Sequence, residues 1–184
     1  MCESRSGLSK MGRYTIAVLP GDGIGPEVVH EAVKVLEAVA NRFGHSFDLR
    51  YAAFGGAAID AAGSPFPPET EKICMSADVV LFGALGSPKW DTLDPAIRPE
   101  KGLLALRKSA RVFANLRPAK LFPELADACY LRPDIVEKGI DIMVVRELIG
   151  DVYFGEPSGI EVRDGERVGF SNMIYWEYEI RRVA

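Results

Sequence analysis

The sequence has no surplus of basic residues and no long apolar run, and each absence excludes a class of protein. Its 184 residues include 22 Lys and Arg against 26 Asp and Glu, a formal net charge of −4. Nucleic-acid binding depends on basic side chains that neutralise phosphates, so this balance argues against a nucleic-acid partner. No apolar stretch approaches the roughly 20 residues of a membrane-spanning helix, so no membrane association is expected.

Cysteine is scarce, and the few thiols are scattered. Cys2, Cys74 and Cys129 lie far apart and match no metal-binding spacing. Unpaired, widely separated cysteines are typical of a reducing compartment. Residues 1–10 are polar and lack the apolar core of a secretory signal. We interpret these residues as a disordered tail and expect a cytoplasmic protein.

The rest of the sequence alternates apolar runs with amphipathic stretches. This alternation predicts an α/β fold with a mostly parallel sheet, in two lobes that span residues 11–112 and 113–184. Strands are expected at residues 14–19, 47–51, 78–83 (fully buried), 112–117 and 140–146. Helices are expected at residues 26–43, 69–76, 102–111, 133–138 and 176–184. A protruding hairpin is expected around a turn at residues 163–166, flanked by residues 152–154 and 167–173.

A glycine-rich stretch, G-D-G-I-G-P-E at residues 21–27, follows the first predicted strand and opens the first predicted helix. Phosphate-binding loops occupy this position in α/β folds. The spacing is G-x-G-x-G, however, and Asp22 would repel a pyrophosphate. The stretch is therefore either a plain tight turn or a ligand-binding loop. A second loop, residues 83–91, follows the carboxyl end of a strand, where open α/β sheets bind ligands; a simple surface loop is the alternative.

Residues 100–117 combine acidic, aliphatic and basic side chains at helical spacing. Leu103 and Leu104 lie three and four residues after Glu100, and Arg107 lies four after Leu103, so these side chains can share a helix face. Guanidinium groups bind carboxylates through paired hydrogen bonds. Together with Arg117 and Arg146, the stretch suggests a pocket for an acid with a branched aliphatic part, although a single arginine is more often a solvated charge.

Seven stretches resemble, in order, motifs of the β-decarboxylating dehydrogenase family that includes isocitrate and isopropylmalate dehydrogenases. They cover nearly all of residues 14–184 and correspond to about the first half of a family member. They are L-P-G-D-G-I-G-P-E (19–27), F-G-G-A-A-I-D (54–60), G-S-P-K-W-D (86–91), R-P-E-K-G-L-L-A-L-R-K (98–108), F-A-N-L-R-P-A-K (113–120), V-R-E-L (145–148) and Y-F-G-E-P (153–157).

The resemblance implies a two-lobed fold that is not a Rossmann fold and is incomplete in this chain. It implies NAD-dependent oxidative decarboxylation of 3-isopropylmalate to 2-oxoisocaproate in leucine biosynthesis, with Mg²⁺ or Mn²⁺, by a homodimer. The alternatives are a homoisocitrate, D-malate or tartrate dehydrogenase of the same family, or a non-catalytic product that acts only as an interaction module. The family's metal-binding aspartates, catalytic lysine and adenosine-binding segment are expected beyond Ala184, so this chain alone is expected to be inactive.

The resemblance also implies residue roles. Tyr153 would be the catalytic acid. Substrate carboxylates would bind Arg107, Arg117 and Arg146, the isopropyl group would contact Leu103 and Leu104, and Glu100 would lie where substrate meets nicotinamide. The cofactor side would comprise Ile24, Ser87, Pro88, Lys89, Trp90, Asp91 and Glu100.

Two positions depart from the family pattern near Tyr153. Ile149 stands where threonine is usual, and Asp151 stands where glycine is usual. The first change removes a hydroxyl group, and the second adds a negative charge two residues from Tyr153. We therefore expect slower or altered catalysis in an intact enzyme with these residues.

Overall fold

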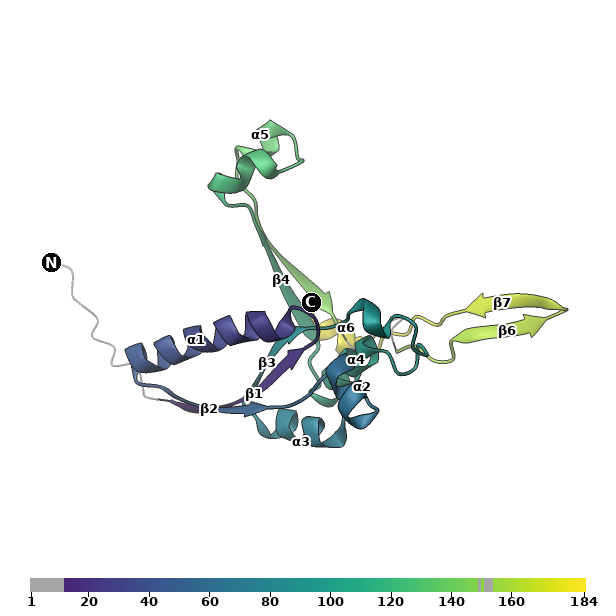
Figure 1. Ribbon diagram of the computed structural model, residues 1–184. Helices are drawn as coiled ribbons and strands as arrows, with labels where there is room; N and C mark the ends of the chain where they lie inside the picture. Colours follow the sequence, from purple (N-terminus) through teal and green to yellow (C-terminus); the bar gives the residue numbers. More distant parts are fainter. Residues whose placement is uncertain (1–11, 149, 151–153) are drawn as a thin grey trace. The chain divides into compact units, whose positions relative to one another are not determined.

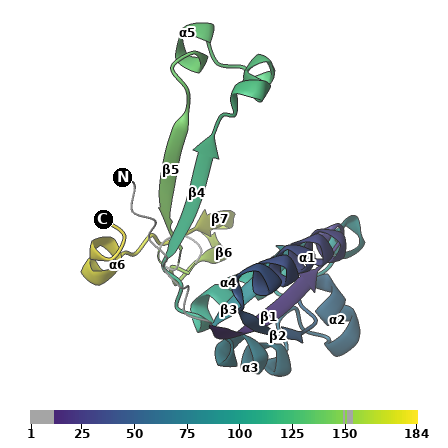
Figure 2. The ribbon, with the colours of Figure 1, turned by 90° about the vertical axis from the view of Figure 1, so that its left-hand side faces the viewer.

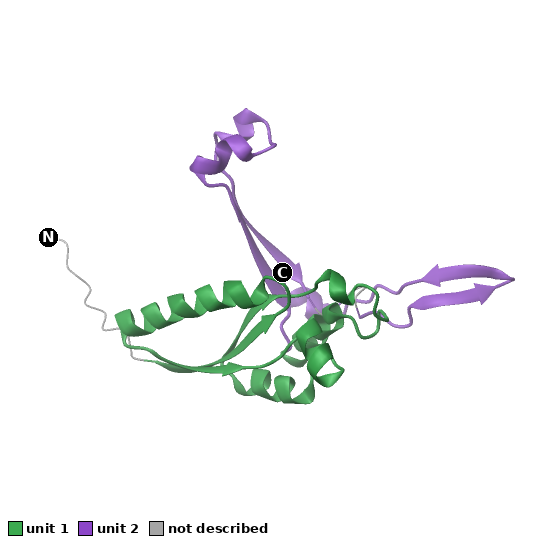
Figure 3. Ribbon diagram, viewed as in Figure 1, with its two compact units in different colours: residues 1–110 green, residues 111–184 purple. Residues whose placement is uncertain are grey.

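Figure 1 shows a computed structural model that describes residues 12–148, 150 and 154–184. The chain divides into two compact units, of which the first ends at Ala110 and the second begins at Arg111 (Figure 3). The sequence analysis had placed a lobe boundary two residues later. Strands pair only within a unit in the described ranges. Within the same ranges, no helix is long and apolar enough to cross a membrane.

The first unit is built on a parallel sheet of three strands. These are β1 (Arg13–Gly21), β2 (Ser46–Tyr51) and β3 (Val79–Ala84), in the order β2-β1-β3. The central position of β1 explains its continuous apolar sequence, because both of its faces are covered (Figure 2). The α/β class predicted from the sequence is confirmed.

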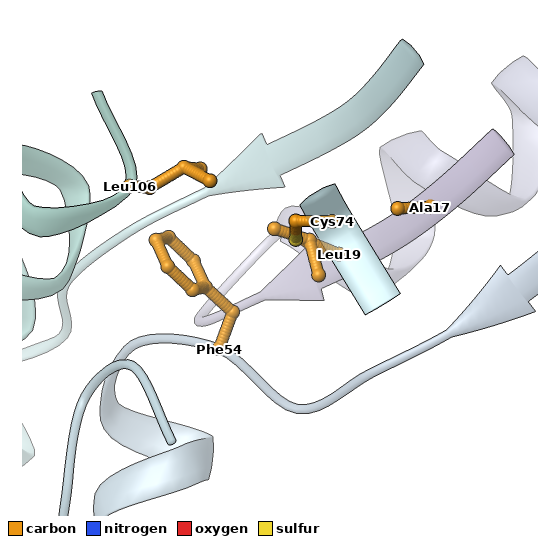
Figure 4. Close-up of a cluster of buried hydrophobic side chains, with 5 residues drawn as sticks. All are labelled: Ala17, Leu19, Phe54, Cys74 and Leu106. Carbon is orange, nitrogen blue, oxygen red and sulfur yellow. The ribbon is translucent and has the colours of Figure 1, made fainter. Parts of the chain in front are cut away.

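Alternate residues of β1 feed two separate cores. One face packs against α1 (Gly25–Phe43), in a cluster of Ile16, Val18, Val29 and Val33. The opposite face packs against α3 (Pro68–Ser76) and α4 (Pro99–Ser109), in a cluster of Ala17, Leu19, Phe54, Cys74 and Leu106 (Figure 4). Burial of each large apolar side chain contributes about 1.5–3 kcal/mol, so the two clusters fix the helices on opposite faces of the sheet.

The first helix ends where the sequence predicted and begins one residue earlier, at Gly25. Pro26 occupies its first turn, where a missing N–H group has no cost. Gly44 ends the helix with a φ of 72°, and its N–H donates to the Ala40 carbonyl over 2.8 Å.

The prediction of a fully buried strand at residues 78–83 was wrong. Val79 is 53% exposed, and the rest of β3 is only partly buried. The reason is topological, because β3 lies at an edge of the sheet and has one neighbouring strand among those described.

One helix was not predicted, and another is shifted. No helix was expected where α2 (Gly56–Ala62) lies, because its seven residues show too little apolar periodicity. The helix predicted for residues 102–111 is α4, which begins three residues earlier. It stops before Arg111, whose φ of 52° is incompatible with a right-handed helix. A further turn of 3-10 helix, Pro88–Trp90, lies inside the predicted loop after β3.

The second unit contains antiparallel rather than parallel pairing, which corrects the expectation of a mostly parallel sheet. β4 (Ala114–Lys120) pairs with β5 (Asp141–Glu147). The connection consists of a 3-10 helix (Pro123–Ala128) and α5 (Pro133–Val136). These short helices form a cap at the far end of the ribbon instead of packing back along it, so the chain returns in the opposite direction (Figure 2).

The predicted hairpin turn is confirmed, but one of its strands lies elsewhere. β6 (Gly159–Arg163) pairs with β7 (Glu166–Phe170), so residue 154 is not part of the hairpin, and residues 152 and 153 lie outside the described ranges. Asp164 and Gly165 have φ values of 52° and 83°, as the two central residues of a type I′ turn require. The last helix, α6, spans Glu177–Arg181, so it is shorter than the helix predicted for residues 176–184, and α5 is likewise shorter than the helix predicted for residues 133–138.

Candidate functional site

The ends of β1 and β3 lie side by side and begin the two loops singled out in the sequence. Gly21 pairs with Ala84, and the Asp22 N–H donates to the Ala84 carbonyl over 2.9 Å. Gly21 has a φ of 74°, and any side chain there would collide with that carbonyl group. Glycine is therefore required for the two loops to approach each other.

The Asp22 carboxylate organises this edge of the sheet. Its Oδ2 accepts hydrogen bonds from the amides of Gly56 and Gly86 over 2.9 and 3.0 Å, and its Oδ1 accepts one from Ala57 over 2.8 Å. The side chain is buried, with 3% of the residue exposed. Charged acceptors form strong hydrogen bonds to amides, so one carboxylate ties three segments of the chain together.

The Asp22 side chain binds amides that lie outside residues 21–27, so the choice between a tight turn and a ligand-binding loop for that stretch stays a prediction. Gly56 and Ala57 begin α2, and the amides at a helix start are the groups that usually bind phosphate. Here these amides already donate to Asp22. The sequence analysis treated Asp22 only as a charge that repels pyrophosphate, whereas it takes the place of an external anion. Because its partners follow 34 to 64 residues later, no local motif could have revealed them.

The loop after β3 lies close to two of the segments that carry predicted cofactor-side residues. A Cβ atom added to Gly86 would lie 3.8 Å from the Glu100 Oε1 atom, and one added to Gly23 would lie 3.4 Å from the Gly86 carbonyl oxygen. Ile24, at the start of α1, is 62% exposed. The structure therefore brings the turn after β1, the loop after β3 and the first turn of α4 together.

Residues 86–91, called the 86–91 loop below, are also held at their far end. The Lys89 Nζ lies 2.6 Å from Asp60 Oδ2, and the Trp90 Nε1 donates to Asp60 Oδ1 over 3.2 Å. These two hydrogen bonds hold the pKa of Asp60 below its ordinary value. Ser87, Pro88 and Asp91 flank the pair on the same loop. The sequence analysis quoted Asp60 in a motif and assigned it no role.

The remaining predicted residues of the first unit lie on α4. Glu100 is exposed in the first turn, and Leu103, Leu104 and Arg107 are partly buried. Leu106, between them in sequence, points into the core. The helical spacing that predicted a shared face is present.

Arg117 and Arg146 lie on the β4–β5 ribbon of the second unit. Asn115 is the partner of Arg146, and Arg117 is the partner of Val144. Paired residues in an antiparallel ladder point to the same face, as do residues two apart on one strand. The two arginines are therefore diagonal neighbours on one face. Arg107 belongs to the first unit, so the convergence of all three arginines stays a prediction.

Glu147, the residue after Arg146, belongs to a network of charged side chains with Glu179 and Arg182. The Arg182 guanidinium lies 3.1 Å from Glu147 and 3.7 Å from Glu179, and it packs against the rings of Phe113 and Tyr178. Glu179 is buried and accepts a hydrogen bond from the Trp176 amide over 2.9 Å.

The same network continues toward the proposed catalytic segment. Glu147 accepts a hydrogen bond from the Gly150 amide over 2.7 Å. Tyr153, Ile149 and Asp151, which the sequence analysis singled out, lie outside the described residues. Glu179 and Arg182 lie three residues apart in the sequence, a spacing that indicates an ion pair on one helix face. The sequence analysis did not use this signal.

A cavity of about 440 Å³ opens at the carboxyl ends of β1 and β2. No charged side chain lines it in the part of the chain that the structure describes. Its lining consists of Pro20, Gly21, Pro26, Tyr51, Ala52, Ala53, Phe54 and Ala57. Nor do three or more His, Cys, Asp or Glu side chains come together there, or elsewhere in the described ranges, as a metal ion would require.

Comparison with known proteins gives consistent matches. The family model described as isocitrate/isopropylmalate dehydrogenase matches residues 15–184. The 3-isopropylmalate dehydrogenase of Nitratidesulfovibrio vulgaris is 62% identical over 169 residues, which are 92% of this chain and 47% of that protein. The 3-isopropylmalate dehydrogenase of Geobacillus kaustophilus is 53% identical over 174 residues, or 95% and 47% of the two chains. The chain thus spans about half the length of these curated relatives.

Solved structures give similar matches. A beta-decarboxylating dehydrogenase from Thermococcus kodakarensis is 31% identical with a TM-score of 0.59, covering 92% of this chain and 43% of that one. An isocitrate dehydrogenase from Methylococcus capsulatus, at 23% identity and a TM-score of 0.66, covers 92% of this chain and 45% of that one and shares the fold.

Proposed function

The chain belongs to the isocitrate/isopropylmalate dehydrogenase family, and on that premise we propose that it serves the NAD-dependent oxidative decarboxylation of 3-isopropylmalate. The observation that carries this proposal is the 62% identity to a curated 3-isopropylmalate dehydrogenase across 92% of the chain. The product would be 2-oxoisocaproate, in leucine biosynthesis and in the cytoplasm.

Substrate binding is assigned to the basic residues. Arg117 and Arg146, as diagonal neighbours on one ribbon face, would bind the malate carboxylates through paired N–H donors. Arg107 is proposed to join them from α4. Two carboxylates offer four acceptor oxygens, which suits several guanidinium groups better than one.

Specificity is assigned to the two adjacent leucines. Leu103 and Leu104, on α4 with Arg107, would contact the isopropyl group of the substrate. An apolar pair favours an aliphatic substituent over the additional carboxylate of homoisocitrate, because that charge would lose its hydration without a partner. It also favours isopropylmalate over D-malate, which lacks the substituent.

The first unit is proposed as the cofactor-side lobe. Ile24, the 86–91 loop and Glu100 would form the wall of this lobe that faces the dinucleotide, with Glu100, close to Gly86, at the junction with substrate. NAD would supply the hydride acceptor. A divalent Mg²⁺ or Mn²⁺ is part of the proposal, but the described residues offer no set of ligands, and no step is assigned to it.

Tyr153 is proposed to donate a proton to the substrate carbon that loses carbon dioxide, as a general acid. Ile149 and Asp151 lie beside it in sequence and are expected to slow this step. In a chain of full family length, the double change Ile149→Thr with Asp151→Gly should raise kcat. An unchanged kcat would show that the two departures have no catalytic consequence.

The second unit is proposed to contribute to a homodimer. Its β6–β7 hairpin exposes Ile160 and Val162, which would pack against the same hairpin of a second copy. Sedimentation of the wild type and of an Ile160→Lys variant would test this assignment, which predicts that the variant is monomeric.

The decisive experiment follows NADH formation from 3-isopropylmalate, NAD and Mg²⁺. It compares this chain with a version extended to the length of its relatives, and it includes D-malate as an alternative substrate. Turnover by the extended version alone, with isopropylmalate preferred, is the expected result. Preference for D-malate would overturn the substrate assignment, and no turnover with either acid would favour a non-catalytic role.

A further inference from the structure

The 86–91 loop is attached to α2 at both ends by carboxylates. At its beginning, the Gly86 amide donates to Asp22, which also accepts hydrogen bonds from the first turn of α2. Further along, Lys89 and Trp90 both contact Asp60, which belongs to α2 itself. The seven-residue helix α2 therefore carries the second attachment point and donates to the carboxylate that forms the first.

The contacts of Trp90 and Lys89 make the second attachment specific. The Trp90 ring lies so close to Gly56 that any side chain at that position would collide with it. The Lys89 Nζ lies 5.1 Å from the centre of the Trp90 ring and also forms the ion pair with Asp60. Both donors of the loop are thus directed toward α2, and the Lys89 charge already has a partner.

This arrangement assigns a role to a residue that the proposed function leaves without one. We propose that Asp60 is a positioning residue for dinucleotide binding. By holding Lys89 and Trp90, its carboxylate keeps the 86–91 loop in a fixed conformation beside Glu100, so the loop does not have to be ordered when the dinucleotide binds. Binding to a pre-ordered loop avoids that entropic cost. This inference rests on the proposed function of the first unit.

An opposing assignment makes Lys89 itself a ligand for the phosphates of the dinucleotide. The two assignments predict opposite effects of one substitution. If Asp60 positions the loop, then Asp60→Asn weakens dinucleotide binding, because the loop loses its ion pair. If Asp60 merely competes with phosphate for Lys89, then Asp60→Asn releases the ammonium group and strengthens binding.

The test has two arms and a matched control. Asp48→Asn is the control, because Asp48 also pairs with a cation and its side chain is 46% exposed, against 45% for Asp60. In the first arm, hydrogen–deuterium exchange is measured on this chain. Asp60→Asn should raise amide exchange in residues 86–91 about threefold to tenfold, in line with the loss of one surface ion pair and one hydrogen bond. Asp48→Asn should leave that exchange unchanged.

In the second arm, the KM for NAD and kcat are measured on the version of family length. Asp60→Asn should raise the KM for NAD about threefold to tenfold and leave kcat within about twofold. Asp48→Asn, the matched control, should leave both the KM for NAD and kcat near those of the wild type, and Lys89→Met should raise the KM as Asp60→Asn does.

The exchange and KM results test the role of Asp60 and the proposed function separately. Unchanged exchange in the loop would show that Asp60 does not hold it, and would overturn the inference. Faster exchange with an unchanged or lower KM would also overturn it, because the attachment would not serve dinucleotide binding. Failure of the wild-type extended protein to use NAD at all would refute the proposed function, and the inference with it, whatever the exchange arm shows.

Discussion

The Oδ2 atom of Asp22 lies 3.0 Å from the amide nitrogen of Gly86, and this hydrogen bond joins the turn after β1 to the loop after β3. Two further amides, from the first turn of α2, donate to the same carboxylate. The geometry of the candidate cofactor side therefore depends on one buried acidic side chain rather than on a bound anion.

Replacing Asp22 should destabilise the first unit strongly. Asp22→Ala removes the acceptor of three buried or partly buried amides, and each unsatisfied amide costs about 1–3 kcal/mol. Because water can partly replace the carboxylate, we expect the free energy of unfolding to fall by about 3 kcal/mol. Urea unfolding followed by circular dichroism measures this change. Asp48→Ala, on exposed β2, should change it by less than about 0.5 kcal/mol; equal effects of the two variants would refute the assigned role of Asp22.

Two adjacent arginines on the last helix should differ in their contribution to stability. Arg182, whose side chain is 23% exposed, pairs with Glu147 and with the buried Glu179. Arg182→Met removes the guanidinium charge from beside the buried Glu179 and the partly buried Glu147, and should lower the free energy of unfolding by about 2–4 kcal/mol. Arg181 is 76% exposed and pairs with Glu177, so Arg181→Met should cost less than about 0.5 kcal/mol. Thermal unfolding of the two variants makes the comparison, and similar melting temperatures would contradict it.

The Asp60 carboxyl group should titrate below its ordinary pKa of 3.8, because Lys89 and Trp90 donate hydrogen bonds to its ionised form. A lowered pKa means that the interaction stabilises the folded protein above pH 3.8 and that this contribution is lost as the pH falls through the folded-state pKa. Carbon-13 NMR of the carboxyl group gives the midpoint directly. Lys89→Met should move the midpoint upward toward 3.8; an unmoved midpoint would show that the ion pair is absent in solution.

The two cysteines in the described ranges should react at different rates with an alkylating reagent. Burial raises the pKa of the Cys74 thiol, with a smaller lowering from a backbone hydrogen bond, so little thiolate forms near neutral pH. Cys129 is partly exposed. In a Cys2→Ser background, we expect Cys129 to be alkylated at least about tenfold faster than Cys74 at pH 8. Urea should abolish the difference, and equal rates in the native protein would show that the core around Cys74 opens readily.

The parts of the fold that follow from local pattern were predictable. Apolar residues at helical spacing, Pro26 at the start and Gly44 at the end identified α1, and the apolar run of β1 identified a strand. Val144 and Val145 belong to a similar run in β5, yet both are exposed there. Apolar runs indicate strands, but they do not reveal which strand is the partner or whether it runs parallel.

The candidate site was predictable only where its residues share one segment. Leu103, Leu104 and Arg107 lie on a single helix, so their spacing sufficed. Asp22 and Asp60 act on residues 29 to 64 positions away, and such contacts leave no trace in the local sequence. The negative charge of Asp22 even suggested that it repels a pyrophosphate rather than stabilises the turn.

The long sequence separations of the Asp22 hydrogen bonds have a consequence for the order of folding. Its partners lie 34, 35 and 64 residues further along the chain. Closing such loops costs more entropy than forming α1 or any hairpin, so contacts of this kind form late. The transition state for folding would then lack them, and replacing Asp22 should accelerate unfolding much more than it slows folding. The Asp22 carboxylate would therefore stabilise the folded site chiefly by slowing its unfolding, after most of the structure has formed.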